Sequence, residues 1–296
     1  MNGSHQPISE IAGVQTERVL VLTHGAVEVT AGVMPTVLAI LDANGVEVLA
    51  TADEQRKHPP LAERTLVTGD ELRPGGVDLV LVLGGDGSIL RALSVEAKTG
   101  APVLGINFGR VGFLATVEQA DLERSLTRAL AGDYVTLGLP SLKAEWIGGT
   151  MLAVNDLALL RGGESRLADL SYSVDGEPVA TVRCDGLICS TPVGSTAYNL
   201  AAGGPTVSWR VKGFVISFIA AHHLDTRPLI LAPEESLVVT NSAVVSSCDV
   251  LADGRHIGEL PPGRSVTVGL GGDEVHLAIF RESSFFRRYR EKFGRP

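Results

Sequence analysis

The chain has 296 residues, of which 34 are acidic and 25 are lysine or arginine, so its formal net charge at pH 7 is −9. This excess of negative charge argues against a general nucleic-acid binder and against a protein that binds anionic membranes, and we expect neither partner. A chain of this length can bury a large core and predicts two domains.

The cysteine content and the hydropathy pattern bear on the compartment. The cysteines, Cys184, Cys189 and Cys248, form no C-x-x-C pair, which predicts reduced thiols rather than a zinc site or a disulfide framework. Residues 1–15 do not combine a basic start with an apolar core, which predicts no signal peptide. No uncharged apolar run approaches the roughly 18 residues of a membrane span. We therefore expect a cytoplasmic protein.

The first half of the chain alternates apolar strands with helix-like segments. The pattern predicts strands at residues 18–23, 46–50, 77–83 and 102–106, and helices at residues 31–44, 88–97 and 118–131. Residues 51–76 are polar and contain Pro59, Pro60 and Pro74, which predicts a loop with little regular structure. Strands that alternate with helices indicate an open, mostly parallel, Rossmann-like α/β domain.

After about residue 140 the rhythm changes to short strands separated by turns. These predicted strands lie at residues 167–174, 187–190, 214–219, 237–240 and 265–268. Asp175–Gly176 and Asp253–Gly254 are strong hairpin signals. We expect an α/β domain over residues 1–140 and a β-rich, sandwich-like domain over residues 141–274. The basic and aromatic tail, residues 275–296, is expected to pack back on the first domain.

Residues 80–91 read V-L-V-L-G-G-D-G-S-I-L-R and form the most informative stretch of the chain. A buried strand stops at Gly84, Gly85 and Gly87, which let the backbone turn tightly and leave room for a bulky ligand. If Ser88 caps the following helix, free N–H groups face this loop, an arrangement that suits phosphate. Asp86 would repel phosphate unless a metal bridges them or the carboxylate serves as a base for a hydroxyl. The alternative is an ordinary strand–turn–helix corner.

A second informative stretch covers residues 183–205. Asp185–Gly186 precedes an apolar strand, and hydroxyl side chains then gather around Pro192 and Gly194. A helix over residues 196–200, with Ser195 as its cap, would offer hydroxyls and free amides to the hydroxyls of a sugar or phosphate. Tyr198 adds a ring with a polar tip. A capped helix in a turn with no ligand fits these residues equally well.

Five segments occur in the order found in NAD kinases, and the chain resembles that family. The segments are G-G-D-G at residues 84–87, N-F-G-R-V-G-F-L at residues 107–114, the pair Asn155–Asp156, D-G-L-I-C-S-T-P-V-G-S-T-A-Y-N at residues 185–199, and H-H-L-D-T-R-P-L-I-L at residues 222–231. The glycine loop alone is shared with diacylglycerol, sphingosine and 6-phosphofructokinase enzymes, whereas the long G-S-T-A-Y segment and N-F-G-x-x-G-F-L are specific.

The resemblance implies transfer of the terminal phosphoryl group of ATP, or of polyphosphate in some members, to the 2′-hydroxyl of the adenosine ribose of NAD. The product is NADP, with Asp86 as general base and Mg²⁺ or another divalent cation bound with ATP. Most of the rate enhancement would come from positioning and charge stabilisation. The resemblance also implies an α/β domain followed by a β-rich domain, and a homodimer or homotetramer.

The site residues carried over from the family are matched position by position. Gly84, Gly85 and Gly87 belong to the phosphate loop, and Arg91 lies one turn further on. The remaining nucleotide-binding candidates are Phe108, Asn155, Asp156, Arg166, Arg183, Asp185, Thr196, Ala197, Tyr198, Asn199 and Ala201. The histidines show no metal-binding pattern, and we assign no protein ligand to a metal.

Two departures and two rival functions accompany the resemblance. Asp156 stands where the family usually has glutamate, and Arg255 where glutamine often follows Asp-Gly. One rival is a lipid or sphingoid-base kinase that shares the glycine loop and would need an apolar groove. The other is a dinucleotide sensor without turnover. The chain has neither the G-x-G-x-x-G of a dehydrogenase after its first strand nor a G-x-x-x-x-G-K-[ST] loop.

Overall fold

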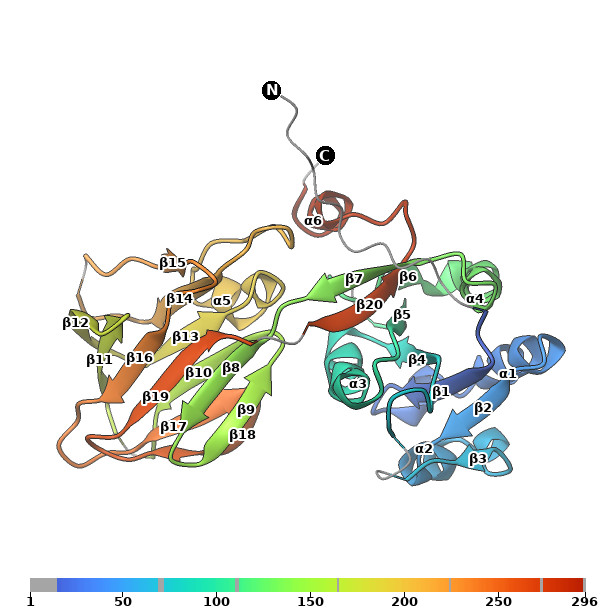
Figure 1. Ribbon diagram of the computed structural model, residues 1–296, viewed down its shortest axis with the longest axis horizontal. Coiled ribbons are helices and arrows are strands. Elements are labelled where there is room, and N and C mark those ends of the chain that lie inside the picture. Colours follow the sequence, from blue (N-terminus) through green and yellow to red (C-terminus); the bar gives the residue numbers. More distant parts are fainter. Residues whose placement is uncertain are drawn as a thin grey trace. The chain divides into compact units, whose positions relative to one another are not determined.

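The computed structural model describes residues 15–68, 72–109, 112–163, 165–223, 225–271 and 274–294. The segment examined for a signal peptide lies almost wholly outside these residues, as do Arg110 and Val111 of the N-F-G-R-V-G-F-L motif. The chain divides into two compact units, visible in Figure 1. Unit 1 comprises Met1–Leu139 together with Val275–Pro296, and unit 2 comprises Pro140–Glu274.

Unit 1 is an α/β fold. Its strands are β1 (Arg18–Thr23), β2 (Glu47–Ala50), β3 (Thr65–Leu66), β4 (Leu79–Gly84), β5 (Val103–Asn107), β6 (Val117–Glu118), β7 (Val135–Leu139) and β20 (Val275–Ile279). Its helices are η1 (Val27–Val29), α1 (Met34–Ala43), α2 (Ala52–Lys57), η2 (Pro59–Leu61), α3 (Asp86–Thr99), η3 (Gln119–Asp121), α4 (Leu122–Leu130) and α6 (Phe285–Phe293).

The sheet of unit 1 runs in the order β3-β2-β1-β4-β5-β20-β7, with β6 paired to β5. All these pairs are parallel except β20 with β7. The chain leaves β1 toward β2 on one side, and β4 on the other side continues to β5. This reversal makes a topological switch point at the carboxyl ends of β1 and β4, where open α/β sheets bind their ligands.

The predicted loop over residues 51–76 is wrong, because this segment contains α2, η2 and β3. Thr51 caps α2 by accepting a hydrogen bond from the Glu54 N–H, and acidic residues follow in the first turn with basic ones in the last. This helix is short and polar, so it lacks the apolar periodicity that reveals longer helices. Capping and charge placement define it instead.

Helix α3 carries the glycine loop at its start. It begins at Asp86 rather than at Ser88, with Gly85 as its N-cap residue, so the predicted Ser88 cap is wrong. Gly100, in a left-handed conformation, ends the helix. Ile89 is fully buried against β5, and a Cβ added at Gly105 would lie 2.3 Å from its Cδ1 atom. A glycine in β5 therefore lets α3 pack closely on the sheet.

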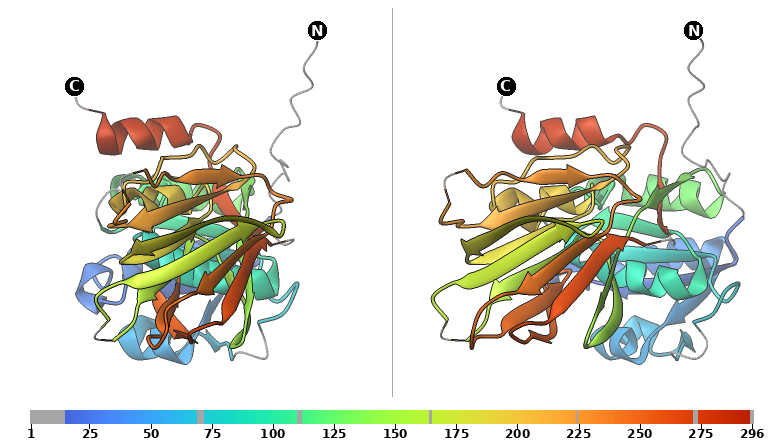
Figure 2. Two further views of the ribbon diagram at one scale, coloured as in Figure 1. Left: turned by 90° about the vertical axis from the view of Figure 1, so that its left-hand side faces the viewer. Right: turned by 60° about the vertical axis from the view of Figure 1, so that its left-hand side comes forward.

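Unit 2 is a sandwich of two six-stranded antiparallel sheets (Figure 2). One sheet has the order β15-β14-β13-β10-β17-β18 and the other the order β12-β11-β16-β19-β8-β9. Its strands are β8 (Leu142–Trp146), β9 (Gly149–Ala153), β10 (Asp156–Arg161), β11 (Ala168–Val174), β12 (Glu177–Cys184), β13 (Gly186–Ser190), β14 (Phe214–Ile219), β15 (Leu229–Leu231), β16 (Leu237–Asn241), β17 (Cys248–Ala252), β18 (Arg255–Leu260) and β19 (Ser265–Leu270). Its helical turns are η4 (Gly194–Thr196) and α5 (Tyr198–Ala201).

The core of unit 2 lies between the inner faces of its two sheets. Leu170 and Val239 from one sheet belong to the same buried cluster as Leu159 and Ile216 from the other. Both predicted hairpin turns are present, with positive φ at Asp175 and Asp253 and at the glycines that follow them. The predicted fold class is confirmed: unit 1 has a mostly parallel sheet, and unit 2 is β-rich and antiparallel.

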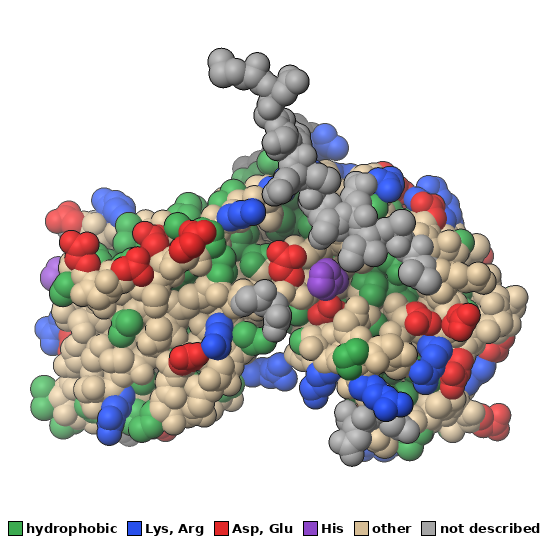
Figure 3. Space-filling model, in the orientation of Figure 1, with side chains coloured by type: hydrophobic (Ala, Val, Ile, Leu, Met, Phe, Trp, Pro, Cys, Tyr) green, Lys and Arg blue, Asp and Glu red, His purple; other side chains and the backbone are tan. Residues whose placement is uncertain are grey.

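The chain returns to unit 1 through β20 and α6. The Phe285 ring lies 5.8 Å from the Phe113 ring, centroid to centroid, and the nearly buried Arg288 donates to Glu118 at 3.0 Å. On the face drawn in Figure 3, acidic and basic side chains are interspersed over both units. Within the described residues, the structure has no helix that is both long and apolar enough to cross a membrane.

Candidate functional site

The Asp86 carboxylate accepts three hydrogen bonds from consecutive backbone amides. Phe113 N–H donates to Oδ2 at 2.8 Å, and Leu114 and Ala115 N–H donate to Oδ1 at 3.0 and 3.3 Å. A carboxylate offers about four lone-pair directions, so these amides fix its orientation and leave it capacity for one further donor. The sequence distinguishes the segment that supplies the amides only by its resemblance to the family, and does not predict its contact with Asp86.

Gly112 makes this contact sterically possible. A Cβ atom added at Gly112 would lie 2.1 Å from Asp86 Oδ1, well inside any real contact distance. Gly84 is likewise required by the chain itself, because an added Cβ would lie 2.6 Å from Ser88 Oγ. In contrast, an added Cβ at Gly85 or Gly87 would meet open space. These two glycines therefore leave the start of α3 uncovered, and Gly87 is exposed.

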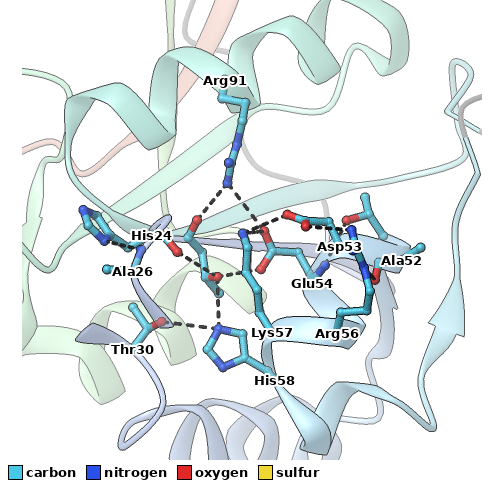
Figure 4. Close-up of polar contacts among 12 residues, drawn as sticks. His24, Ala26, Thr30, Ala52, Asp53, Glu54, Arg56, Lys57, His58 and Arg91 are labelled. Carbon is cyan, nitrogen blue, oxygen red and sulfur yellow. Dashed lines mark hydrogen bonds and ion pairs between the residues drawn. The ribbon is translucent and has the colours of Figure 1, made fainter. Parts of the chain in front are cut away.

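The glycine loop lies at the switch point of the unit 1 sheet. The His24 N–H donates to Leu83 O at 2.8 Å, which joins the end of β1 to the end of β4. Arg91 reaches from α3 to the same place, where Nη2 donates to Thr23 O at 2.8 Å (Figure 4). Arg91 follows Gly87 by four residues, so both lie on one face of α3. The structure thus brings together the residues predicted to bind phosphate, which are Gly84, Gly85, Asp86, Gly87 and Arg91.

A buried carboxylate that the sequence did not reveal lies beneath Arg91. The Glu54 side chain is 1% exposed, and its Oε1 lies 3.0 Å from Lys57 Nζ and 3.5 Å from Arg91 Nη2. Thr23 Oγ1 donates to its other oxygen at 2.5 Å and also contacts His58 Nε2 at 3.0 Å (Figure 4). Burial lowers the pKa of His58, which favours a neutral ring in this network.

Phe108 lies beside the same loop. Its N–H donates to Gly84 O at 3.3 Å, and its ring is partly buried against the hydrophobic core of unit 1. The neighbouring Asn107 side chain accepts from Gly109 N–H and donates to Glu118, so this turn is fixed by its own side chain. Phe108 therefore combines a partly exposed ring with a backbone hydrogen bond to Gly84, one of the residues predicted to bind phosphate.

Asp156 is the first residue of β10 in unit 2, and Asn155 directly precedes it; both are buried, at 4% and 9% exposure. Asn155 Oδ1 is buried without a hydrogen-bond partner among the residues that the structure describes. Burial is the main cause that raises the pKa of Asp156 to about 7; the Asp253 charge raises it further, and the Tyr198 backbone N–H opposes both. A buried acceptor and a carboxyl group that titrates near neutrality are typical of a binding site.

Asp253 holds this pair from below and was not among the predicted site residues. Its Oδ1 accepts from the N–H groups of Asn155 and Asp156, at 2.7 and 3.2 Å, and its Oδ2 accepts from Val154 N–H at 3.0 Å. The sequence identified Asp253 only as a hairpin residue, and no local signal connects it with a segment almost 100 positions earlier.

The segment after β13 lies beside the Asn155–Asp156 pair. Thr191 N–H donates to Asn155 O at 2.9 Å, and η4 and α5 follow at once with Thr196, Ala197, Tyr198 and Ala201. Thr196 and Ala197 are partly exposed, and Tyr198 and Ala201 are exposed. The structure therefore brings these four candidates together with Asn155 and Asp156.

Two details of this segment differ from the prediction. Ser195 does not cap a helix: it lies within η4, where its hydroxyl donates to Pro192 O and accepts from Val207 N–H. The Asn199 side chain is fully buried and donates to Ser195 O and Pro205 O, while Ser217 Oγ donates to its Oδ1 at 2.7 Å. These contacts make Asn199 a support of the turn.

Asp185 and Arg183 lie at the other end of β13. The register of β10 with β13 places Asp156 opposite Ser190 and Leu160 opposite Gly186. The two ends of β13 are therefore four residues, or about 13 Å, apart. Asp185 pairs with Arg161 at 3.2 Å, and Arg183 pairs with Asp169 at 2.8 Å. Arg166 is exposed in the segment between β10 and β11. Within one chain, Asp185 and Arg183 do not join the Asn155–Asp156 group.

Family models match segments in both units of the chain. The model described as ATP-NAD kinase N-terminal domain matches residues 15–134, and the model described as ATP-NAD kinase C-terminal domain matches residues 154–279. The chain is 37% identical over 260 residues to NAD kinase 2 of Streptomyces coelicolor, covering 85% of this chain and 86% of the relative. It is 37% identical over 267 residues to the NAD kinase of Leifsonia xyli subsp. xyli, covering 87% of each.

Solved structures show the same architecture. The yeast NADH kinase complexed with NADH matches with a TM-score of 0.83, covering 95% of this chain and 88% of that one, and its 24% identity shows the fold alone. The NAD kinase of Archaeoglobus fulgidus in complex with ATP matches with a TM-score of 0.70 at 25% identity, covering 94% and 97%. Fold, site and relatives together define a phosphotransferase. The chain belongs to the NAD kinase family.

Proposed function

We propose that the protein transfers the terminal phosphoryl group of ATP, or of polyphosphate, to the 2′-hydroxyl of the adenosine ribose of NAD and forms NADP. The observation that carries this proposal is the Asp86 carboxylate, fixed by three amides at the switch point of a parallel sheet. An acid in a glycine loop suits a reaction in which a hydroxyl must lose its proton to attack a phosphorus atom.

Asp86 acts as the general base in this proposal. Three of its lone-pair directions are taken by the amides of residues 113–115, and the remaining one accepts the hydrogen bond of the substrate hydroxyl. As the ribose oxygen bonds to the γ-phosphorus, its proton passes to Asp86 and the bond from phosphorus to the bridging oxygen breaks. ADP leaves with the electron pair of that bond.

The start of α3 and Arg91 stabilise the phosphates. Helix α3 has 14 residues, and its first turn is uncovered at Gly85 and Gly87, so free N–H groups and the positive end of the helix dipole face the ligand. Arg91, with 45% of its side chain exposed, adds a full positive charge on the same face. When bound, Mg²⁺ supplies further charge neutralisation on the phosphates.

We assign the proposed metal to the nucleotide rather than to a protein cage. Mg²⁺ is commonly held by substrate phosphates with only one or two carboxylates. The part of the chain that the structure describes contains no group of three or more His, Cys, Asp or Glu side chains arranged to hold an ion. We therefore expect the cation to enter and leave with ATP.

Unit 2 supplies the dinucleotide contacts in this proposal. Asn155 and Asp156 bind polar groups of NAD, because one offers an unpartnered acceptor and the other a carboxyl group beside the Tyr198 N–H. Thr196, Ala197, Tyr198 and Ala201 surround the adenosine. Arg166, Arg183 and Asp185 remain candidate contacts, although Arg183 and Asp185 already have ion-pair partners and lie about 13 Å from Asp156 along β13.

The family resemblance also leads us to propose a cytoplasmic homodimer or homotetramer. The three cysteines are free and buried, which is compatible with a reducing compartment. Light scattering on the purified protein measures the assembly directly. A monomer at micromolar concentration would contradict this part of the proposal.

The decisive experiment measures NADP formation from NAD and Mg-ATP by the purified protein. An Asp86→Asn variant keeps the shape of the side chain and removes the base, so we expect NAD binding to persist while turnover falls by at least about 100-fold. Asp133→Asn, an exposed position in the same unit, serves as the matched control and should retain full activity. Turnover by the Asp86 variant at the parent rate would refute the base assignment.

The same assay separates the rival functions. Saturable NAD binding would favour a dinucleotide sensor if there is no turnover with ATP or polyphosphate as the donor and NAD or NADH as the acceptor. A protein that neither binds nor phosphorylates NAD, but phosphorylates a sphingoid base or diacylglycerol, would be a lipid kinase. We favour the dinucleotide because the residues around Asn155 and Asp156 are polar and hydrogen-bonding.

A further inference from the structure

Asp253 does more than a hairpin turn requires. It lies between β17 and β18 with φ at 47°, and Gly254 follows with φ at 73°, which is the geometry of a two-residue turn of type I′. In addition, Asp253 N–H donates to Asp156 O at 2.9 Å, while its carboxylate accepts from three consecutive amides of another segment. The turn is thus hydrogen-bonded to the segment at the start of β10 that contains Asn155 and Asp156.

The Asp175 hairpin has the same kind of turn, so it shows which of the Asp253 contacts the turn itself does not require. Asp175 lies between β11 and β12 with φ at 50°, and its N–H donates to Ser236 O at 2.9 Å. Among the residues that the structure describes, its carboxylate accepts from one amide, that of Ser236 at 2.9 Å. Asp175 and Asp253 therefore share turn geometry, but Asp253 binds three amides beside the candidate NAD contacts.

The backbone of Asn155 is also held from its other side. Its carbonyl oxygen accepts from Thr191 N–H at 2.9 Å, and a Cβ added at Gly194 would lie 1.9 Å from that oxygen. The peptide therefore lies between the Asp253 turn and the turn after β13, with little room to move. The Asn155 side chain, in contrast, keeps a buried Oδ1 with no partner among the described residues. A fixed backbone with an unused acceptor is prepared for a ligand.

We propose that Asp253 is a positioning residue of the NAD site: its carboxylate fixes the backbone of Val154, Asn155 and Asp156 so that the Asn155 and Asp156 side chains meet the dinucleotide. The inference rests on the proposed function, because it takes NAD as the ligand. Asp253 itself acts through the pair and need not touch NAD.

The test compares Asp253→Asn with Asp175→Asn. Asparagine tolerates the left-handed conformation of both turns, but its Nδ2 cannot accept a hydrogen bond, so at least one amide at residues 154–156 loses its acceptor. We expect the KM and the Kd for NAD to rise about 10-fold in Asp253→Asn, with the KM for Mg-ATP changed less than about two-fold. Asp175→Asn should keep the parent values, and thermal unfolding should show both variants folded.

The pH dependence of NAD binding gives a readout that a turn-only role would not move. The groups that face Asp156 are Asp253, Cys189 of β13 and the Tyr198 N–H. Removing the Asp253 charge lowers the pKa of Asp156, so the pH at which NAD affinity changes should move down in Asp253→Asn. It should stay unchanged in Asp175→Asn.

Each outcome decides the proposal. An unchanged Kd for NAD and an unchanged pH profile in folded Asp253→Asn would overturn the positioning role and leave a turn residue. If this variant does not fold, hydrogen exchange on the parent decides: amides of residues 154–156 that exchange as fast as free peptides, with and without NAD, would overturn it. A parent protein that neither binds nor phosphorylates NAD fails the proposed function itself, and the inference falls with it.

Discussion

Glu54 and Arg91 come from segments 37 positions apart and meet at the end of β1, where Oε1 and Nη2 lie 3.5 Å apart. Glu54 is almost completely buried, while Arg91 is half-exposed. The buried carboxylate also pairs with Lys57 at 3.0 Å and accepts from Thr23 Oγ1. The buried Glu54 carboxylate therefore holds one side of the Arg91 guanidinium group, and the rest of the Arg91 side chain is partly exposed to solvent.

We expect Glu54→Gln to destabilise the protein by about 2–4 kcal/mol, because it removes one partner of a buried ion pair and leaves Lys57, 14% exposed, without its closest buried partner. Urea unfolding of parent and variant measures this difference. Glu47→Gln is the matched control, since the Arg18–Glu47 pair is exposed and should contribute less than about 1 kcal/mol. Equal costs at the two positions would contradict the role of burial.

We expect Gly112→Ala to lower kcat by about 100-fold or more, because the added methyl group overlaps the Asp86 carboxylate and displaces the proposed base. NAD binding should be nearly unchanged. Steady-state kinetics and equilibrium binding measure the two effects separately. Gly109→Ala is the control, because its nearest neighbour, Asn107 Oδ1, is 3.9 Å from the added atom. A fully active Gly112→Ala enzyme would show that the geometry of Asp86 is not critical.

Asp156 makes the stability of the protein depend on pH in a defined direction. Its pKa is raised from 3.8 to about 7, so between these values the folded state binds more protons than the unfolded state. Stability therefore falls as pH rises through this window and levels above about pH 7. The slope is about 1.4 kcal/mol per pH unit well below the folded-state pKa and halves at that pKa, so the free energy of unfolding should drop by about 2 kcal/mol between pH 5 and pH 7.

The matched variant for this prediction is Asp156→Asn, which removes the titrating group and keeps the side-chain size. Its unfolding free energy should change by about 2 kcal/mol less over the same pH range than that of the parent. Urea unfolding without NAD, at half-unit pH steps, gives both curves. Parallel curves would mean that Asp156 does not titrate in this window.

We expect Asn199→Ala to cost about 2–4 kcal/mol of stability, because it leaves the buried Ser217 Oγ and Ser195 carbonyl, and the partly buried Pro205 carbonyl, without their Asn199 partner. The NAD affinity of the folded variant should change only a few-fold, in keeping with a supporting role. Asn44→Ala is the control: its amide caps α1 at the surface and should contribute at most about 1 kcal/mol. A 100-fold loss of NAD affinity without loss of stability would make Asn199 a direct ligand instead.

Local sequence signals predicted four strands and the three longer helices in the first part of unit 1, but only five of the twelve strands described in unit 2. The strand at residues 18–23 and the strand at residues 214–219 match β1 and β14 residue for residue, because continuous apolar runs bounded by polar residues suit buried strands. The Asp-Gly pairs located both hairpins through the backbone geometry that this dipeptide favours. Helix α2 escaped detection because a short polar helix has no apolar period.

The contacts that shape the candidate site were beyond prediction for a different reason. Asp86 meets amides 27–29 residues away, and Asp253 meets amides 97–99 residues away. A carboxylate that binds backbone N–H groups places no requirement on the side chains of its partners. Gly112 leaves the space that Asp86 needs, but a glycine by itself does not identify the carboxylate that it accommodates. The sequence could show which residues carry the chemistry, but only the fold shows what holds them.

The position of β20 has a consequence for synthesis of the protein. This strand, residues 275–279, lies inside the unit 1 sheet between β5 and β7, although all other strands of that sheet precede residue 140. As the chain emerges from the ribosome, unit 2 is a continuous segment and is complete first, while the sheet carrying the glycine loop still lacks an internal strand. Residues 275–279 therefore complete the unit 1 sheet, so a nascent chain cannot complete this sheet before all of unit 2 has been synthesised.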